Sequence, residues 1–284
     1  MSAFTDQLGR TLILPQPPRR IISLVPSQTE LLYTLGLDSV VGITKFCIHP
    51  TSWFREKTRV GGTKDVHPDR VHSLRPDLIL ANKEENDQQQ IEELARHYPV
   101  WISDVKTLPD ALDMIRSVGD LTGRGQEGDK LASEIARRFA QLHAQPITPA
   151  PAGPRDAPAG PRDAPAGPRT AYFIWRNPWM AAGGDTFIHD MLRHCGLTNA
   201  FGHLDRYPSV ELTSLAETGC TQVLLSSEPY PFRERHIQEI RAILPDATIR
   251  LVDGELFSWY GSRLLAAPAY FRQLYPFCCI AGGS

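Results

Sequence analysis

The feature that most constrains the fold is a regular alternation of short apolar runs and helix-like segments along the first part of the chain. We expect strands at residues 20–25, 40–44, 78–81 and 100–102, and helices at residues 27–35, 68–74 and 87–98. Ser27 and Glu30 have the spacing of a capping box, which predicts that the first helix begins there. Short, largely apolar strands that alternate with helices are typical of a parallel sheet covered on both faces. The sequence therefore predicts an α/β fold.

The same alternation returns in the second half of the chain. We expect strands at residues 171–175, 222–226 and 248–252, and helices at residues 186–195, 212–217, 234–244 and 263–274. Between the two halves, residues 108–121 and 129–143 carry apolar side chains at helical spacing and show no strand signal. A helix inside a βαβ unit is normally shorter, so we expect this tract to run between two lobes. The predicted domains are an N-terminal α/β lobe at residues 1–105, a helical tract at 106–145, a proline-rich linker at 146–169 and a C-terminal α/β lobe at 170–284.

A low-complexity segment precedes the second lobe. The unit Ala-Pro-Ala-Gly-Pro-Arg-Asp repeats from Ala150, and the repeat ends at Arg169. Because prolines recur and no apolar positions repeat as in a coiled coil, the segment predicts an extended, solvated linker of polyproline character. It is either a neutral repeat expansion in an exposed loop, or a spacer or ligand for an SH3-type domain.

Charge and composition limit the kinds of partner. The 284 residues carry a formal net charge of −2, so there is no basic field that would gather nucleic acid or an anionic membrane. No apolar run approaches the roughly 18 residues of a membrane span, and the N-terminal residues lack the charged-then-apolar pattern of an export signal. The five cysteines form no CxxC pair, which indicates reduced thiols. We therefore expect a monomer that is cytoplasmic as written, or periplasmic if the true start lies upstream.

The sequence shows no pattern typical of an enzyme. Residues 123–128 match GxGxxG, but this motif binds a dinucleotide only when it follows a strand and precedes an acidic residue about 20 positions on. Here the motif follows a helix and lacks that acid, so we interpret it as a break between two helices. GxSxG, Walker and HExxH motifs are absent, and the sequence pairs no nucleophile with a base. We expect neither catalysis nor a catalytic cofactor.

Cys47 and His49 form a local pair that suits a soft metal ion. They lie on the same side of a predicted extended segment, and a thiolate and an imidazole are both ligands for such ions. A structural zinc site needs four ligands, so this pair does not make a metal site of its own. Either His49 provides an axial ligand to a metal already held by a macrocycle, or both are ordinary strand-end residues.

Aromatic side chains are concentrated directly after predicted strands. They are Phe46 in the first lobe and Trp175, Trp179, Phe257, Trp259 and Tyr260 in the second. In open α/β sheets, ligands bind beyond the carboxyl ends of the strands, and large rings there suit a large flat ligand. Either these rings contact a ligand or they close the core of their lobe.

Polar residues at similar positions could add hydrogen bonds to such a ligand. Lys83, Glu84 and Asn86 follow the strand at residues 78–81, and Arg263 starts the last predicted helix. A guanidinium group can pair with carboxylates or amides by two parallel hydrogen bonds. A solvated loop and a surface charge are the alternatives for these residues.

Several segments resemble a known protein family. In the first lobe they are RIISLVPSQTELLYTLGL, VVGITKFCIHP, GGTKDVHPDRVHSLRPDLILANKEEN and PVWISDVKTLPDALDMI, and in the second AYFIWRNPWMAAGGDTFIHDMLRHCGLTNAF, VLLSS and DGELFSWYGSRL. The chain resembles the class III periplasmic binding proteins, the helical-backbone receptors that feed importers of cobalamin, haem and ferric siderophores. The resemblance implies two Rossmann-like lobes with parallel sheets, joined by a single long helix at residues 129–143, and a shallow cleft.

The resemblance also implies a function. It is strongest to the cobalamin-binding branch, in which aromatic residues at the positions of Phe46, Trp175 and Trp259 would line the cleft. We therefore expect a substrate-binding protein for a metal-bearing small molecule, a corrinoid such as cobalamin, that serves an ABC transporter. The alternatives are a haem or ferric-siderophore binding protein, and a cytoplasmic regulator or enzyme with the same fold.

Docking on a permease would use one acidic residue on each lobe. By the resemblance, the first-lobe position is Asp69, whose carboxylate could pair with an arginine of the permease. The second-lobe position falls near Thr213 and Ser214, which carry no charge. The sequence therefore predicts one docking ion pair where the family tends to have two.

Overall fold

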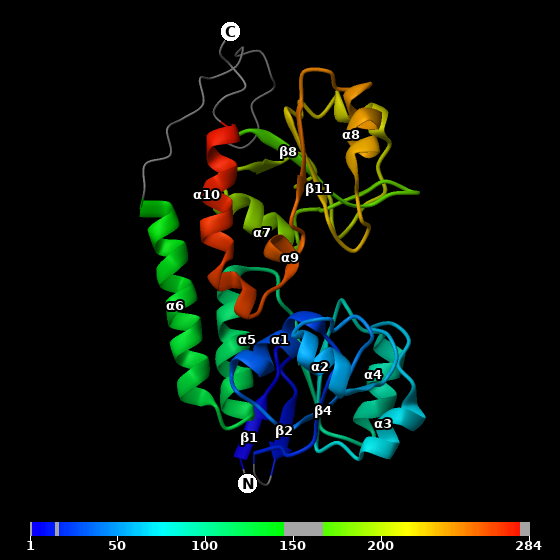
Figure 1. Ribbon diagram of the computed structural model, residues 1–284, viewed down its shortest axis with the longest axis vertical. Coiled ribbons are helices and arrows are strands. Elements are labelled where there is room, and N and C mark those ends of the chain that lie inside the picture. Colours follow the sequence, from blue (N-terminus) through cyan, green and yellow to red (C-terminus); the bar gives the residue numbers. More distant parts are fainter. Residues whose placement is uncertain (1, 15–16, 145–166, 279–284) are drawn as a thin grey trace. The chain divides into compact units, whose positions relative to one another are not determined.

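The computed structural model of the chain describes residues 2–14, 17–144 and 167–278 (Figure 1). Within these ranges the chain forms two compact units. Unit 1 comprises residues up to 105 together with 109–136 and 259–264, and unit 2 comprises residues 106–108, 137–258 and those from 265 onward. The sequence interpretation assigns residues 109–136 to the helical tract and residues 259–264 to the second lobe, so the units differ there from the predicted domains.

Unit 1 is built on a five-stranded parallel sheet with the strand order β5-β4-β3-β6-β7. Its strands are β3 (Ile21–Ser23), β4 (Val40–Ile43), β5 (Thr58–Arg59), β6 (Leu78–Asn82) and β7 (Val100–Ser103). Every residue of the central strands β3 and β6 is buried, as expected in a parallel sheet that is covered on both faces, and every residue of the edge strand β7 is buried as well. The four predicted strands and their parallel arrangement are confirmed, and the short β5 is an addition.

Helices alternate with these strands. They are α1 (Pro26–Thr34), α2 (Thr51–Glu56), α3 (Pro68–Leu74), α4 (Gln88–Ala95), most of α5 (Leu108–Leu121) and the first part of α6 (Gly125–Ala144). The predicted capping box at the start of α1 is wrong, because the N-cap is Val25, no side chain caps the helix, and Pro26 begins it. Proline suits the first helical position, since its φ is already helical and its missing N–H would have no partner there. The Glu30 carboxylate pairs instead with Arg263.

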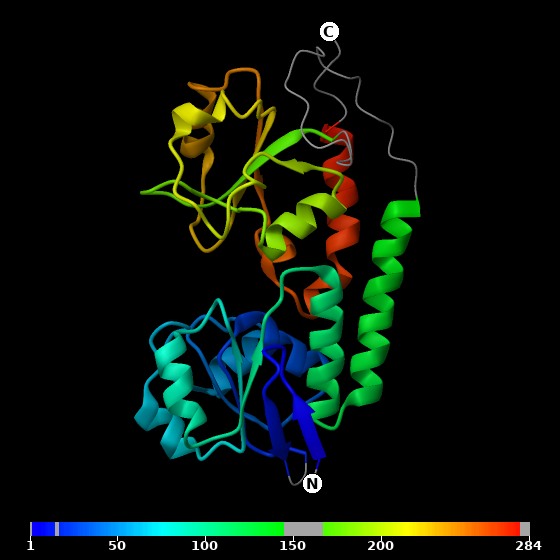
Figure 2. The ribbon, with the colours of Figure 1, turned by 180° about the vertical axis from the view of Figure 1, so that it is seen from behind.

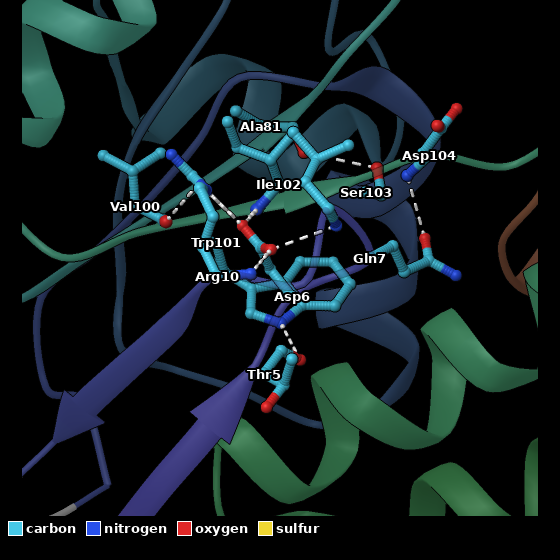
Figure 3. Close-up of polar contacts among 11 residues, drawn as sticks. Thr5, Asp6, Gln7, Arg10, Ala81, Val100, Trp101, Ile102, Ser103 and Asp104 are labelled. Atoms are coloured by element: carbon cyan, nitrogen blue, oxygen red, sulfur yellow. Dashed lines mark hydrogen bonds and ion pairs between the residues drawn. The ribbon is translucent and has the colours of Figure 1, made fainter.

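An N-terminal hairpin that the sequence did not predict completes unit 1. Its antiparallel strands are β1 (Ser2–Thr5) and β2 (Thr11–Leu14). Figure 3 shows the hydrogen bonds that connect the turn between these strands to β7. The buried Asp6 carboxylate accepts hydrogen bonds from the backbone N–H of Ile102 (3.3 Å) and from Arg10 Nε (2.8 Å), and Trp101 Nε1 donates to Thr5 O (3.3 Å). These stabilising contacts come from residues that are distant in the sequence, so the hairpin could not be recognised from local sequence.

Helices α5 and α6 lie side by side where both belong to unit 1 (Figures 1 and 2). Helix α6 begins at Gly125, so it starts earlier than the predicted residue 129 and leaves only a short turn after α5. A Cβ atom added at Gly119 of α5 would lie 3.1 Å from the Cα of Gly128 in α6, and the reverse distance is also 3.1 Å. Of the glycines in the GxGxxG match, Gly123 therefore lies in the turn between the helices, and Gly128 of α6 packs closely on the backbone of α5. Residues of α6 up to 136 belong to unit 1 and those from 137 to unit 2.

Unit 2 contains a second parallel sheet with the order β10-β8-β11-β12, and β9 pairs antiparallel with β8. Its strands are β8 (Arg169–Trp175), β9 (Met180–Ala181), β10 (Thr198–Asn199), β11 (Gln222–Ser226) and β12 (Thr248–Val252), and its helices are α7 (Phe187–His194), α8 (Glu234–Arg241), α9 (Glu255–Ser258) and α10 (Ala267–Cys278). The three strands predicted after residue 170 are confirmed as β8, β11 and β12. The last helix starts at Ala267 instead of residue 263, because residues Ser262–Leu265 form a separate 3₁₀ turn.

The predicted proline-rich linker falls mainly on residues 145–166, outside the described residues. Its predicted end at residue 169 is wrong, because Arg169 is already part of β8 and pairs with Thr198 of β10. The carbonyl of Pro168 also accepts a hydrogen bond from the Thr198 N–H at 3.1 Å. The second sheet therefore begins slightly before the repeat ends.

Each unit has its own hydrophobic core. In unit 1, strand residues such as Ile79 pack with helix residues such as Ile91. In unit 2, Phe173 of β8 packs with Ile237 of α8 in the same way. Because strands and helices are fixed by these cores, the loops at the carboxyl ends of the strands start from defined positions.

Candidate functional site

The loop after β4 carries the most exposed aromatic ring among the predicted site residues of unit 1. Phe46 is 51% exposed, and the Lys45 Nζ lies 5.2 Å from its ring centroid. Covering such a ring is favourable, since full burial of a large apolar side chain contributes about 1.5–3 kcal/mol. Phe46 therefore offers apolar surface at the carboxyl edge of the first sheet.

Cys47, next in the chain, is fully buried and does not share that surface. Thr29 Oγ1 donates to its Sγ at 3.1 Å, and Thr44 Oγ1 lies at the same distance. Burial raises the pKa of the thiol, so the sulfur stays protonated and is a poor metal ligand. The side chain connects the loop after β4 to α1, which is a packing role.

His49, Trp259 and Arg263 form a contiguous group in unit 1. The His49 and Trp259 rings meet edge to face, with centroids 5.7 Å apart and planes at 70°. The Arg263 guanidinium lies 4.7 Å from the Trp259 ring centroid, and its Nε lies 3.0 Å from Glu30 Oε2. Trp259 is only 6% exposed, whereas His49 and Arg263 are half-buried. The structure therefore brings three predicted residues together, and more of the accessible surface belongs to His49 than to Trp259.

Tyr260 is buried, and its hydroxyl donates a hydrogen bond to Glu85 Oε1 at 2.5 Å. Burial, and then the neighbouring Glu85 carboxylate, raise the pKa of the phenol well above its ordinary value, so the phenol keeps its proton. A hydrogen bond to a carboxylate is stronger than one between two neutral groups. The pair therefore holds Tyr260 against the loop after β6.

The start of the loop after β6 is accessible. Lys83 is exposed and its Nζ lies 2.6 Å from Asp104 Oδ2. Glu84 is half-buried, and its backbone carbonyl accepts a hydrogen bond from Lys64 Nζ at 2.5 Å. These two predicted residues keep side-chain surface for a ligand, although the charge of Lys83 is already balanced.

Asn86, at the end of the same loop, is buried with 3% exposure. Its Oδ1 accepts a hydrogen bond from the Asn82 N–H at 2.8 Å. Its Nδ2 donates to Leu24 O at 3.3 Å and to Thr63 O at 2.9 Å. The amide therefore binds the loop to the rest of unit 1, and its donors and its oxygen are used within the protein.

In unit 2, the exposed ring is that of Trp175, the last residue of β8. Trp175 is 39% exposed, and its ring centroid lies 5.6 Å from that of Tyr230. Tyr230 follows β11, which pairs in parallel with β8, so two neighbouring strands deliver both rings to one edge of the sheet. Arg176 lies next to Trp175 and pairs with Glu239 at 2.9 Å. This edge therefore offers aromatic surface beside a cation that is already neutralised.

The other predicted rings of unit 2 are less accessible. Trp179 is half-buried and stacks on Phe232, with centroids 5.5 Å apart and planes at 17°. Phe257 has no exposed surface and packs against Tyr172 and Phe271. For Phe257 the packing favours the alternative that the ring closes the core, and we leave it out of the proposed ligand contacts.

Sequence comparison places these two units in a known family. The family described as periplasmic binding protein matches residues 21–240, which is most of the chain. The chain belongs to the periplasmic binding protein family. Similar curated proteins include the vitamin B12-binding proteins of Photorhabdus laumondii (31% identical over 136 residues, 47% of this chain and 49% of that protein) and of Yersinia pestis (34% identical over 133 residues, 46% of each). The chain spans about half the length of the curated relatives it matches.

Solved structures of periplasmic binding proteins share the fold over nearly the whole chain. The vitamin B12 binding protein BtuF of Vibrio cholerae has a TM-score of 0.75 at 21% identity, covering 93% of this chain and 99% of that one. The haem-binding protein BhuT with two hemes has a TM-score of 0.75 at 20% identity, covering 93% and 100%. The molybdate-binding MolA of Haemophilus influenzae has a TM-score of 0.77 at 15% identity, covering 98% and 92%. At such identities the likeness establishes the α/β fold with parallel sheets, and it does not choose among ligands.

The described part of this periplasmic binding protein contains neither a metal cluster nor a membrane-spanning helix. In residues 2–14, 17–144 and 167–278, no three or more His, Cys, Asp or Glu side chains are grouped so that they could hold a metal ion. No helix in these ranges is long and apolar enough to cross a membrane. Because the Cys47 thiol is buried, His49 is the remaining member of the predicted soft-metal pair, and its role as an axial ligand stays a prediction.

The predicted docking residue Asp69 lies exposed in the first turn of α3. In unit 2, Thr213 and Ser214 lie in a 3₁₀ turn (Leu212–Leu215), and the exposed Glu211 directly precedes that turn. The position of Asp69 is compatible with a protein contact, and its docking role stays a prediction.

Sequence reasoning did not assign Glu30, Glu85 or Tyr230 to the site, although it predicted a capping-box role for Glu30. Tyr230 follows β11 as the predicted aromatic residues follow their strands, so the same rule would have found it. The pairing of Glu30 and Glu85 could not be predicted, because their partners Arg263 and Tyr260 are distant in the sequence.

Proposed function

We propose that the chain is a substrate-binding protein for a large, flat, metal-bearing molecule, and that its ligand is a corrinoid such as cobalamin. The observation that carries the proposal is the exposure of Phe46 and Trp175 at the carboxyl ends of two parallel sheets. Ligands bind at this edge in open α/β sheets, and exposed rings suit the face of a macrocycle. Membership of the periplasmic binding proteins and similarity to vitamin B12-binding proteins support the choice of ligand.

Three of the cations near the proposed contacts are already paired, which favours a ligand without strong net charge. Lys83, Arg176 and Arg263 each pair with a carboxylate, at 2.6, 2.9 and 3.0 Å respectively. An anionic ferric siderophore would need several cations that converge on it. Haem, with two propionate groups, meets the same difficulty. We therefore rank both below a corrinoid and keep haem as the comparison ligand.

The proposed contacts come from the accessible residues. In unit 1 they are Phe46 and His49, with Lys83 and Glu84 as polar neighbours. In unit 2 they are Trp175 and Tyr230, with Trp179 contributing its exposed edge. In this proposal, the contact residues are held in place by three residues that do not touch the ligand themselves: Trp259, Tyr260 and Arg263.

The proposal includes a role in transport. The protein would carry its ligand unchanged to the permease of an ABC transporter, in the periplasm after which its family is named. Asp69 on α3 would pair with an arginine of the permease, and such charge pairs mainly orient the two proteins and accelerate their encounter.

Calorimetric titration with cyanocobalamin, and separately with hemin, tests the proposal. We expect cyanocobalamin to bind with a Kd of about 1 μM or lower, about −8 kcal/mol, and hemin to bind more weakly. A shift of the cobalamin absorbance spectrum that is lost in His49→Ala would assign an axial imidazole. Tighter binding of hemin than of cyanocobalamin would replace the corrinoid by haem. Absence of binding by both would overturn the proposal.

A further inference from the structure

The segment Trp259–Leu264 belongs to unit 1, although the residues on either side of it in the chain belong to unit 2. Gly261, within the segment, packs directly on α1. A Cβ atom at this position would lie 2.6 Å from the carbonyl oxygen of Ser27 and 3.4 Å from the Leu31 Cβ. A side chain would therefore collide with the helix backbone, so the glycine allows the segment to lie directly against α1.

Two polar contacts, one on each side of this glycine, hold the segment against the rest of unit 1. The Tyr260 hydroxyl donates to Glu85 Oε1 at 2.5 Å, and Arg263 Nε lies 3.0 Å from Glu30 Oε2. The Arg263 and Glu30 side chains are only 21% and 20% exposed. A pair so shielded from water is screened less by salt than a surface ion pair. The Arg263 guanidinium is therefore held in one place.

This fixed guanidinium is part of a chain of contacts that leads to His49. Glu30 pairs with Arg263, Arg263 lies 4.7 Å from the Trp259 ring centroid, and that ring meets the His49 imidazole edge to face at 5.7 Å. A cation over an indole face is attracted by the ring quadrupole, and edge-to-face aromatic pairs have a preferred geometry. Each member therefore restricts the orientation of the next.

We infer that Glu30 and Arg263 are positioning residues: they orient Trp259 and, through its ring, the His49 imidazole that faces the ligand. The inference rests on the proposed function for the ligand, but the orientation itself is a property of the free protein. It also assigns Arg263 a different role from the direct ligand contact that the sequence suggested, because its guanidinium is already engaged by Glu30 and by Trp259.

The test uses the whole chain labelled with 5-fluorotryptophan and with ¹⁵N-histidine. Fluorine NMR reports each tryptophan, and Trp259→Leu identifies the Trp259 signal. The side-chain ¹⁵N signals of His49 are identified by His49→Gln. We expect Glu30→Gln, which keeps the size of the side chain and removes its charge, to shift or broaden both the Trp259 and the His49 signals. Arg263→Lys keeps the positive charge but loses the planar guanidinium group that lies over the Trp259 ring. It should shift or broaden the same signals to a smaller extent.

The matched control is Asp129→Asn. Asp129 pairs with Arg116 at the same Nε-to-oxygen distance of 3.0 Å, in a contact that includes no ring. This variant should leave both signals unchanged. In a Trp259→Leu background, Glu30→Gln should no longer move the His49 signals, because the ring that transmits the effect is missing. A general loss of structure would instead move the signals of all tryptophans together.

The outcomes separate the inference from the proposed function. Unchanged Trp259 and His49 signals in Glu30→Gln, or a His49 shift that persists without Trp259, would overturn the positioning role. With cyanocobalamin, we expect Glu30→Gln to raise the Kd about 3- to 30-fold, which lies within the range that couplings between contacting residues span. Shifted signals with an unchanged Kd would overturn the link from orientation to affinity. If the unsubstituted protein binds no cyanocobalamin, the proposal of a corrinoid ligand fails, and the NMR signals still decide the positioning role.

Discussion

Replacing Asn86 by alanine separates a stabilising role of this buried amide from a ligand-binding role. Its Oδ1 accepts from the Asn82 N–H at 2.8 Å, and its Nδ2 donates to Leu24 O at 3.3 Å and Thr63 O at 2.9 Å. A buried hydrogen bond between neutral groups contributes about 1 kcal/mol, so the three together predict a loss of about 3 kcal/mol in the free energy of unfolding. The loss is large because the alanine leaves a buried backbone N–H without its acceptor.

The measurement should report on unit 1 alone, because the two units need not unfold together. Hydrogen exchange of the backbone amides of β6 does so, and a loss of about 3 kcal/mol predicts exchange about 100-fold faster in the variant. Asn86→Asp is the matched variant. It keeps the acceptor for Asn82 but places a carboxylate oxygen against two carbonyls, so at neutral pH it should destabilise unit 1 at least as much as alanine does.

A ligand-binding role gives the opposite pattern. Exchange in β6 would then be nearly unchanged in Asn86→Ala, and the affinity for cyanocobalamin would fall. A loss of less than about 1 kcal/mol from unit 1, which is the contribution of a single hydrogen bond, would refute the reasoning.

Three further predictions concern unit 2 and the repeat. Trp175→Ala should weaken cyanocobalamin binding by about 1–3 kcal/mol with folding intact, which calorimetry measures. Phe257→Ala should instead destabilise unit 2 by about 3–5 kcal/mol, which thermal denaturation measures. If Trp175→Ala binds cyanocobalamin as tightly as the unsubstituted protein, Trp175 does not belong to the site. Burial, and then Arg193, lower the pKa of His189 below the ordinary 6.5, so the unfolded chain takes up the proton first. The melting temperature of unit 2 should therefore fall as the pH drops below that value, and His189→Gln should reduce the fall; parallel pH profiles would contradict this. Deletion of residues 150–165 should leave folding and affinity unchanged, as circular dichroism and calorimetry would show, and loss of either would mean that the repeat supports the structure.

The α/β fold could be predicted because the central strands are largely apolar and fully buried. Strand β6 is buried along its whole length, and such a run between two turns has few other interpretations. The N-terminal hairpin could not be predicted in this way. Its strands have four residues each, and the contacts that stabilise them come from Ile102 and Trp101, far along the chain.

The predicted start of the last helix at residue 263 was wrong for a similar reason, whereas the helix itself is present from Ala267. Its apolar residues keep helical spacing, but Arg263 lies in a 3₁₀ turn and pairs with Glu30, near the other end of the chain. A local pattern contains no information about a partner at that distance.

The candidate site shows the same limit at the level of single side chains. A position after a parallel strand predicts that a ring lies near the carboxyl edge of the sheet. It does not predict on which side of the chain the ring points. Phe46 and Trp175 are exposed, whereas Phe257 is fully buried against Tyr172 and Phe271. Tertiary packing decides between these outcomes.

Solved structures with this fold include proteins named for vitamin B12, haem and molybdate, so the fold alone does not select the ligand. We expect selection in this chain to come from the residues at the sheet edges. An anion that approached Arg176 or Arg263 would have to compete with Glu239 or Glu30, and separating a partly buried ion pair leaves a charge without its partner. A ligand with a large flat face and little net charge avoids that penalty and covers the exposed rings. In the proposed site, the paired cations would thus act against anionic ligands, and the exposed rings would favour a macrocycle.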